Sequence, residues 1–375
     1  VFGRMTSKSA QSEAPNLLDR KKILREAWQA SRKQKAVYIV GLAVLLFFLL
    51  LVGLSNGGAS FNVAESWDAL LSGITLGKEE MDVSQRIIWQ LRVPRVLMAI
   101  AGGMGLAVAG LVMQTILRNP LASPYTLGIS SAASFGAAIA IVTGLSANSF
   151  MSGLIPANYI IAFNAFLCAA VCTFVVYGLS KTQQVTAETI VLFGVAMNFL
   201  FSAATSFLQY IGSEERLAEL VYWMFGSLSK ATWGKLQLTA VVVAIVMLLI
   251  FMKAWDYNAL ALGDETAGSL GLNVERLRVF GLLLSSLVTA VIVSLLGPIG
   301  FIGLVAPHIG RILIGSDHRY LIPISALLGA CLLLAADVLS CKILSPVVVP
   351  VGIVTSFVGV PLLAYLVTRR RTERW

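Results

Sequence analysis

Long apolar segments alternate with short polar ones along most of this chain. The first, 36–54, has no charged residue and is long enough to cross the hydrocarbon core of a bilayer as a helix. Further apolar segments follow at 96–117, 125–145, 157–179, 188–212, 236–252, 279–296, 299–314, 321–340 and 350–368. The pattern predicts an all-α polytopic membrane protein with about ten transmembrane helices.

The composition supports this class and excludes others. Hydrophobic residues make up 57% of the 375 residues and charged residues only 13%, whereas a soluble domain has about 25% charged residues. The net charge of +9 comes from basic residues at the ends of the apolar segments. We therefore expect contact with membrane lipid rather than with nucleic acid.

The distribution of the 28 Lys and Arg residues predicts the orientation. Most of them fall on the side of the two termini, and this side is normally cytoplasmic. The chain divides into a basic N-terminal tail at 1–35, a transmembrane domain at 36–368 and a short tail at 369–375. The tail has a helical stripe of basic and apolar residues, which fits an amphipathic helix on the headgroups as well as an unstructured segment.

Two of the segments have a polar or small-residue face. In 188–212 the polar residues fall at helical spacing and line one face: Asn198, Ser202, Thr205, Ser206 and Gln209. Polar groups facing lipid are costly, so this face either lines a transport path or bonds to other helices. In 350–368 a second face contains Gly352, Thr355, Ser356 and Gly359. It lies between two prolines, and because glycine and proline allow a helix to bend, this small polar face suits a gate.

The longest cytoplasmic segment, 256–278, has the signals of a short helix at about 264–270, with acidic residues at its start and glycine at its end. Apolar clusters flank it. The residues concerned are Leu262, Gly263, Asp264, Glu265, Ala267, Leu270 and Gly271. The segment is either a docking element for a partner or a connecting loop on the headgroups.

Sites for chemistry are scarce in the sequence. Two of the four cysteines, Cys168 and Cys172, share a helix face that no acidic or histidine residue joins, and the cysteines are interpreted as small buried hydrophobes. His308 is alone in its segment, so we expect no metal site. The chain has no G-x-x-x-x-G-K-[ST] loop, so we expect it to bind no nucleotide or other cofactor itself.

An ordered set of motifs resembles the FecCD-type permeases, the membrane subunits of bacterial ABC importers for iron–siderophores, haem and cobalamin. The resemblance extends from about residue 36 to the C-terminus. It rests on Arg92-Val93-Pro94-Arg95, Asn119-Pro120-Leu121-Ala122, Trp223-Met224-Phe225-Gly226, Leu262-Gly263, Leu270-Gly271, Gly300-Phe301-Ile302-Gly303-Leu304-Val305-Ala306-Pro307-His308, Asp317-His318-Arg319, Ala336-Asp337 and Pro350-Val351-Gly352.

This resemblance implies the type II ABC importer permease fold, in the bacterial cytoplasmic membrane. It also implies a second permease subunit, a cytoplasmic ATPase pair that carries ATP and Mg, and an extracytoplasmic binding protein. The segment 263–272 would couple to the ATPase, the two polar faces would line and gate the path, and Arg92 and Arg95 would meet the binding protein. The alternative for these arginines is a snorkelling cation at the membrane interface.

One departure from the family pattern concerns the binding-protein side. Many relatives have another arginine near the end of the segment 321–340, followed by a Glu-Leu-Pro-like turn. Here the sequence is Ser340-Cys341-Lys342 and then Val348-Val349-Pro350. Lys342 replaces the cation, displaced by one position, and the glutamate is missing.

The functional hypothesis is a permease subunit for an iron–siderophore, with cobalamin or haem as alternative cargo and no enzymatic activity of its own. A secondary transporter driven by an ion gradient is the alternative from another class. Such a transporter usually needs several buried charged groups, and Asp337 is the clearest one here. A membrane-embedded enzyme would need a metal site or a catalytic dyad, which the spans do not offer.

Overall fold

The computed structural model describes residues 17–56, 67–69, 71–73, 82–145, 156–182 and 187–369. All ten predicted segments correspond to helices. Seven spans are long and apolar enough to cross a membrane, and they involve α1 (Leu17–Ser55), α4 (Val93–Ile116), α7 (Ala157–Thr182), α8 (Ala187–Ile211), α10 (Trp233–Met252), α13 (Val274–Leu296) and α15 (His318–Lys342). Among the described residues, three apolar helices are shorter: α5 (Ile129–Val142), α14 (Ile302–Ile314) and the part Val351–Tyr365 of α16 (Val351–Arg369).

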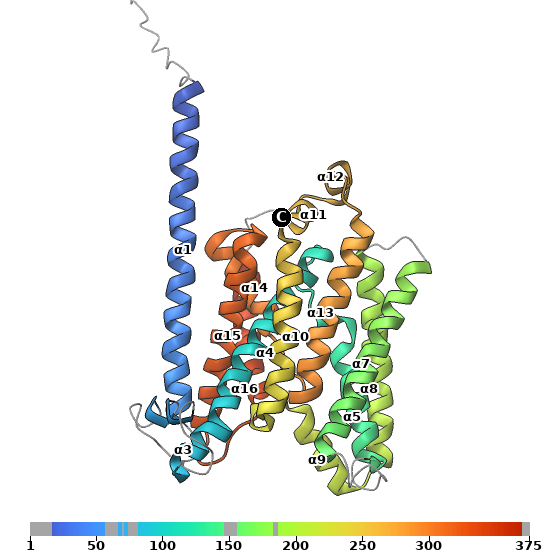
Figure 1. The fold of residues 1–375 in the computed structure, drawn as a ribbon. Helices are drawn as coiled ribbons and strands as arrows, with labels where there is room; N and C mark the ends of the chain where they lie inside the picture. Colours follow the sequence, from blue (N-terminus) through green and yellow to red (C-terminus); the bar gives the residue numbers. More distant parts are fainter. Residues whose placement is uncertain are drawn as a thin grey trace, which may run out of the picture.

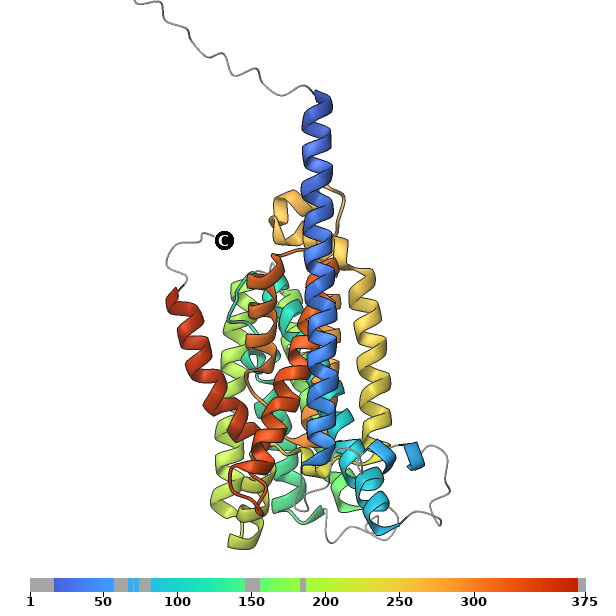
Figure 2. The same cartoon turned by 90° about the vertical axis from the view of Figure 1, so that its left-hand side faces the viewer.

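The first span is longer than the sequence indicated. Helix α1 begins at Leu17 and continues without a break through the predicted span, so it projects well beyond the other helices (Figures 1 and 2). The part 17–35 of the tail is therefore neither unstructured nor a separate helix along the membrane surface. Most of the C-terminal tail, 370–375, lies outside the described residues.

The second span also begins earlier than predicted. Helix α3 (Val83–Ile87), the π-helical turn η1 (Ile88–Arg92) and α4 follow one another directly, as one helical segment of 34 residues. Pro94 lies in the first turn of α4, directly after the π-helical turn, and its missing N–H removes one backbone hydrogen bond from this helical segment. Arg92 and Arg95 are therefore on a helix, not on a loop before it.

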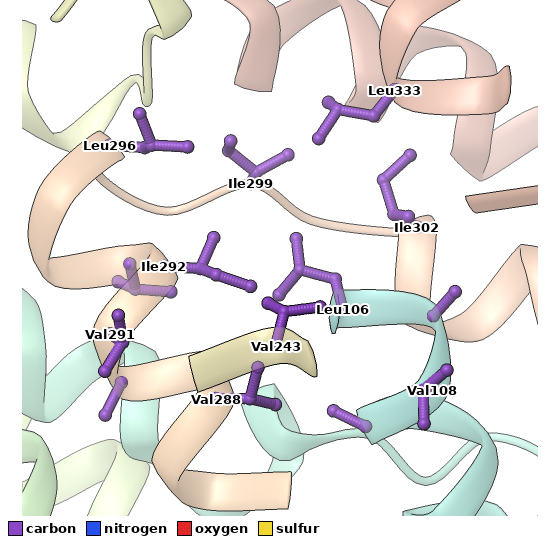
Figure 3. Packing of buried hydrophobic residues seen from close by; sticks show 14 of the residues in the cluster. Leu106, Val108, Val243, Val288, Val291, Ile292, Leu296, Ile299, Ile302 and Leu333 are labelled. Atoms are coloured by element: carbon purple, nitrogen blue, oxygen red, sulfur yellow. The ribbon is translucent and has the colours of Figure 1, made fainter. Parts of the chain in front are cut away.

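Helix α4 is the centre of the fold. It packs against α10, α13, α14 and α15, and nearly all of its side chains are buried. Figure 3 shows Leu106 of α4 among Val243, Ile292, Ile302 and Leu333, which come from the four surrounding helices. On the outside, α1 packs against α15, while α5, α7 and α8 form a second group joined to the core through α13.

The connection between α13 and α14 is a short extended break inside the bundle. Gly297 and Phe301 have φ of +83° and +67°, which ends one helix and starts the next. The Tyr125 hydroxyl, from the 3₁₀ turn η2 (Pro124–Leu127), donates to the Ile299 carbonyl (2.6 Å) and accepts from the Ile299 N–H (2.7 Å). These bonds satisfy backbone groups that have no helical partner in the break.

The two ends of the bundle differ. Helices α11 (Ala254–Ala261) and α12 (Asp264–Ser269) lie at one end, together with the start of α1 and the end of α16. Helix α9 (Glu214–Met224), the turn η3 (Leu228–Lys230) and α3 lie at the other end (Figure 1). Both ends of the described chain are thus on the side of α12, as an even number of crossings requires.

Close contact between α4 and α15 generates a first prediction. A Cβ atom at Gly103 would overlap the backbone carbonyl of Gly329, which has no flexible side chain to move aside. We expect Gly103→Ala to reduce the stability of the purified protein by about 1–3 kcal/mol, the usual cost of overpacking. Thermal unfolding in detergent measures this effect.

The matched control is Gly41→Ala on α1, where the added methyl group meets nothing within 4 Å. It should leave the melting temperature unchanged or raise it slightly, because alanine favours the helix. Equal melting temperatures for the two variants would contradict the close contact.

Candidate functional site

The short helix predicted in the segment 256–278 is confirmed as α12. Gly263, with φ of +125°, provides a backbone conformation at its start that a side chain would strain. Within α12, the side chain of Ala267 is buried. Leu262 and Leu270, on either side, are 71% and 64% exposed, so α12 presents two apolar side chains at the end of the molecule.

An ion pair fixes α12 to the transmembrane helices. The guanidinium of Arg278, near the start of α13, contacts the Asp264 carboxylate at 2.7 Å. Its Nε donates to the Ile116 carbonyl, the last residue of α4, at 3.1 Å. Arg278 is buried, so one side chain joins α12, α13 and the end of α4.

The last turn of α4 has further partners on other helices. The Arg311 guanidinium of α14 donates to the Gln114 side chain, and the Gln114 amide donates to the Leu304 carbonyl (3.3 Å). Thr115 bonds to the buried ring of His318 at the start of α15 (2.8 Å). We call Gln114, Thr115 and Ile116 with these partners the α4 junction.

The junction extends to α11 through His318. The other ring nitrogen of His318 contacts the Asn258 side chain of α11 at 2.9 Å, and the Asn258 amide donates to Asp317 at 2.9 Å. Burial tends to raise the pKa of Asp317, but hydrogen bonds from Arg319 and Asn258 outweigh it and lower that pKa to about 2. The carboxylate is therefore ionised at neutral pH and keeps α11 and α15 together.

The polar face of α8 is divided in the structure. Asn198 is partly buried and accepts a hydrogen bond from Ser131 of α5. Thr205 is buried and bonds to the Phe201 carbonyl of its own helix (2.7 Å). Ser202 and Ser206 are exposed. Gln209 lies near the Met224 sulfur (3.8 Å), so the face has an interhelical part and an exposed part.

The small-residue face of α16 packs against the break between α13 and α14. A Cβ atom at Gly359 would overlap the Phe301 side chain, and one at Gly352 would overlap the Phe225 carbonyl. Thr355 is buried, and its hydroxyl and that of Ser356 bond to the Gly352 carbonyl (3.1 and 2.8 Å). In this conformation the face is a packing surface, and its role as a gate stays a prediction.

Two cavities meet at Phe301, which the sequence motifs contained but did not single out. One cavity, of about 260 Å³, is lined by Tyr125, Asn198 and the Phe301 side chain. The other, of about 90 Å³, lies between Phe301 and α16 at Thr355 and Gly359. Phe301 therefore separates the polar face of α8 from α16, and its positive φ is strained for a bulky residue.

At the opposite end, the two arginines have intramolecular partners. Arg92 is only 7% exposed and donates to the Leu54 carbonyl near the end of α1 (2.8 Å). Arg95 forms a forked contact with the buried carboxylate of Asp337, with a shortest distance of 2.7 Å. Neither is presented as an exposed cation, so their docking role stays a prediction with a competing structural role. Lys342 is exposed.

Comparison with known proteins gives the family. The model of the FecCD transport family matches residues 45–369. This chain belongs to the FecCD transport family.

The FecCD relatives include an ABC transporter permease protein of Methanocaldococcus jannaschii, 45% identical over 339 residues, which cover 90% of this chain and 95% of the relative. The hemin transport system permease protein HmuU of Yersinia pestis is 37% identical over 337 residues, 90% and 97% of the two chains. The molybdate import system permease protein MolB of Haemophilus influenzae is 33% identical over 330 residues, 88% and 94% of the two chains.

A solved structure has the same fold. It is an inward-facing conformation of a metal-chelate type ABC transporter, with a TM-score of 0.76 and 30% sequence identity, covering 89% of this chain and 99% of the other. The chain is therefore an ABC importer permease with the type II fold, a multi-pass membrane protein. FecCD permeases are transport subunits that work with an ATPase and a substrate-binding protein.

The ion pair between Arg95 and Asp337 gives a second prediction. Removing one partner leaves a buried charge, which costs about 3–5 kcal/mol, so Asp337→Ala should strongly lower the melting temperature. The double variant Arg95→Leu/Asp337→Leu removes both charges and should be more stable than Asp337→Ala. A thermal double-mutant cycle in detergent measures the coupling.

The matched control is the exposed pair Lys253–Asp256 (3.0 Å). Asp256→Ala should cost less than about 1 kcal/mol, because water and salt screen such pairs. If Asp337→Ala is as mild as this control, Arg95 is not engaged with Asp337 and remains available for docking.

Proposed function

We propose that this chain is the permease subunit of an importer for ferric chelates, with an iron–siderophore as its cargo. A second permease subunit completes the path, an ATPase pair binds at the α12 end, and an extracytoplasmic binding protein delivers the cargo at the α9 end. The α12 end, with both termini, is cytoplasmic.

The observation that carries this proposal is the combination of exposed leucines on either side of α12 with its attachment to the α4 junction. Leu262 and Leu270 offer an apolar contact surface to a partner. Through Asp264 and Arg278, a displacement of α12 by that partner reaches α4 and α13 directly. This is the connection that a permease powered by a separate ATPase needs.

Import against a gradient requires an energy source outside this chain. A thousandfold gradient corresponds to about 4 kcal/mol, and the sequence has no nucleotide-binding loop of its own. ATP binding to the partner shifts the population of two packing arrangements. Phe301, between the cavity at Asn198 and the face of α16 at Gly359, is the side chain that must move for the path to open.

Two kinds of relative support the cargo class. The similar solved structure is of a metal-chelate type transporter, and relatives from Helicobacter pylori and Bacillus subtilis are named as iron chelatin and siderophore permeases. Haem is the second candidate, favoured by the 37% identity to the hemin permease of Yersinia pestis. Cobalamin is a further alternative, since a relative from Halobacterium salinarum is named as a permease of a cobalamin import system.

The arrangement of charges argues against an ion-coupled secondary transporter. Asp337, the clearest acidic group within a span, is neutralised by Arg95 and is not available as a carrier of protons or sodium ions.

Uptake in proteoliposomes tests the cargo. The complete transporter, with its ATPase and binding protein, should accumulate a radiolabelled ferric siderophore when ATP is enclosed, and an uncoupler should not prevent it. Haem and cobalamin are compared under the same conditions. Accumulation of haem alone would replace the siderophore proposal, while uptake that stops with the uncoupler would overturn ATP-driven import.

A variant of α12 tests the coupling role. We expect Asp264→Ala to free α12 from Arg278 and thereby to reduce cargo uptake per ATP hydrolysed, by about tenfold for a loss of about 1.4 kcal/mol of coupling. ATPase activity and binding-protein affinity should persist. Asp256→Ala, at the same end but outside the α4 junction, is the control with normal coupling. Normal uptake by Asp264→Ala would exclude the role of this ion pair.

A further inference from the structure

A long apolar groove runs along the membrane-facing surface between α7 and α10. Both helices pack on α13, and Leu287 and Val291 of α13 also line the groove. The cavity has a volume of about 810 Å³. Its walls are almost entirely hydrocarbon, as at Phe163, Phe166, Val242 and Val291, and Asn164 and Ser294 add a small polar area. Its size and composition suit an acyl chain.

The groove lies next to a polar cavity at the α9 end. This second cavity, of about 210 Å³, shares the lining residues Ser294 and Leu295 with the groove, so the two are adjacent. Lys230 and Lys235 line it together with Trp223. This arrangement places a site for a lipid headgroup next to a site for an acyl chain.

The two lysines are close together and poorly exposed. Lys235 is only 5% exposed, and its ammonium donates to the Lys230 carbonyl at 3.1 Å. The Lys235 ammonium lies 6.0 Å from the centre of the Tyr159 ring, and that of Lys230 lies 5.7 Å from the centre of the Trp223 ring. Aromatic rings of this kind are typical of the membrane–water boundary.

The positive charge of this cavity is only partly balanced within the described part of the chain. None of the ion pairs found there involves Lys230 or Lys235, and Glu219 supplies the one carboxylate that lines the cavity. Burial and the neighbouring Lys235 lower the pKa of Lys230 to about 8, against the opposing effect of the Glu219 carboxylate. An anion placed between the two ammonium groups would relieve this unfavourable burial.

We propose that the groove binds one anionic phospholipid, with its phosphate between Lys230 and Lys235 and an acyl chain along α7, α10 and α13. The lysines supply the charge selectivity, and the groove supplies the apolar surface. A free phosphate would contact only the lysines, and a neutral lipid would contact only the apolar surface of the groove. The site is separate from the path at Asn198 and from α12, and it does not depend on the proposed cargo.

Native mass spectrometry of the detergent-purified protein tests the headgroup site. Phosphatidylglycerol should bind about thirtyfold more tightly than phosphatidylcholine with the same acyl chains, because each of the two lysines near an anionic lipid contributes about fivefold. The variant Lys230→Gln/Lys235→Gln should lose this preference. Lys342→Gln, which changes an exposed lysine at the same end, should keep it. Equal binding of the two lipids by the wild type would overturn the proposal.

A neighbouring pair of valines tests the chain site. Val242 lines the groove, and Val242→Phe should fill it and reduce the retention of phosphatidylglycerol. Val241 is 57% exposed and does not line the groove, so Val241→Phe should have no effect. Equal effects of both variants, or competition by glycerol phosphate at the same concentration as the lipid, would show that the groove holds no chain.

A charge-preserving variant and a titration distinguish the loss of the lysine charges from misfolding of the protein. Lys230→Arg/Lys235→Arg should retain the lipid preference, with a melting temperature close to that of the glutamine variant. In the wild type, phosphatidylglycerol should raise the pKa of Lys230 from about 8, measured by NMR of dimethylated lysines, and phosphatidylcholine should leave it unchanged. If phosphatidylglycerol leaves the pKa of Lys230 unchanged, the phosphate does not bind beside this lysine and the proposal is wrong.

Discussion

The carbonyl of Ile116 at the end of α4 is the constraint on which the rest of the structure depends. A helix leaves its last four carbonyls without helical partners. Those of Met113, Gln114 and Thr115 accept from the backbone N–H groups of residues 117–119, whereas the buried Ile116 carbonyl needs a side-chain donor. Here Arg278 serves the Ile116 carbonyl and at the same time holds Asp264 of α12. The need to satisfy one buried backbone group thus fixes the external helix to the central span.

This arrangement provides a route by which the proposed ATPase partner would act on the membrane helices. Helix α4 packs against four other spans, so a displacement at the α4 junction is felt across the bundle, because packed interiors are not continuously deformable. The break at 297–301 is the least regular part of the core. It is held by Tyr125 on one side and by α16 on the other, and Phe301 lies between two cavities there. The proposed coupling element and the proposed gate are therefore both adjacent to α4.

The sequence predicts the spans and α12 well, because length, hydrophobicity and capping signals are local. It also identifies Asp337 and Arg95 as notable charges. It does not pair them, since they are 242 residues apart and their contact depends on α4 packing against α15. The bond from Arg92 to Leu54 and the contacts of Arg278 could not be predicted either, because they also depend on the packing of segments far apart in the sequence. The positive φ of Phe301 has no signal at all in the residue type, because glycine is the usual choice there.

The central claim is that α12 and the end of α4 move as one unit, and distance measurements between spin labels test it most directly. One label replaces Gly268 on the open side of α12, and the other replaces the exposed Arg118 directly after α4. In the complete transporter, the distance between these labels should be the same with and without ATP, and Asp264→Ala should broaden it. A distance that changes with ATP in the wild type would contradict the account.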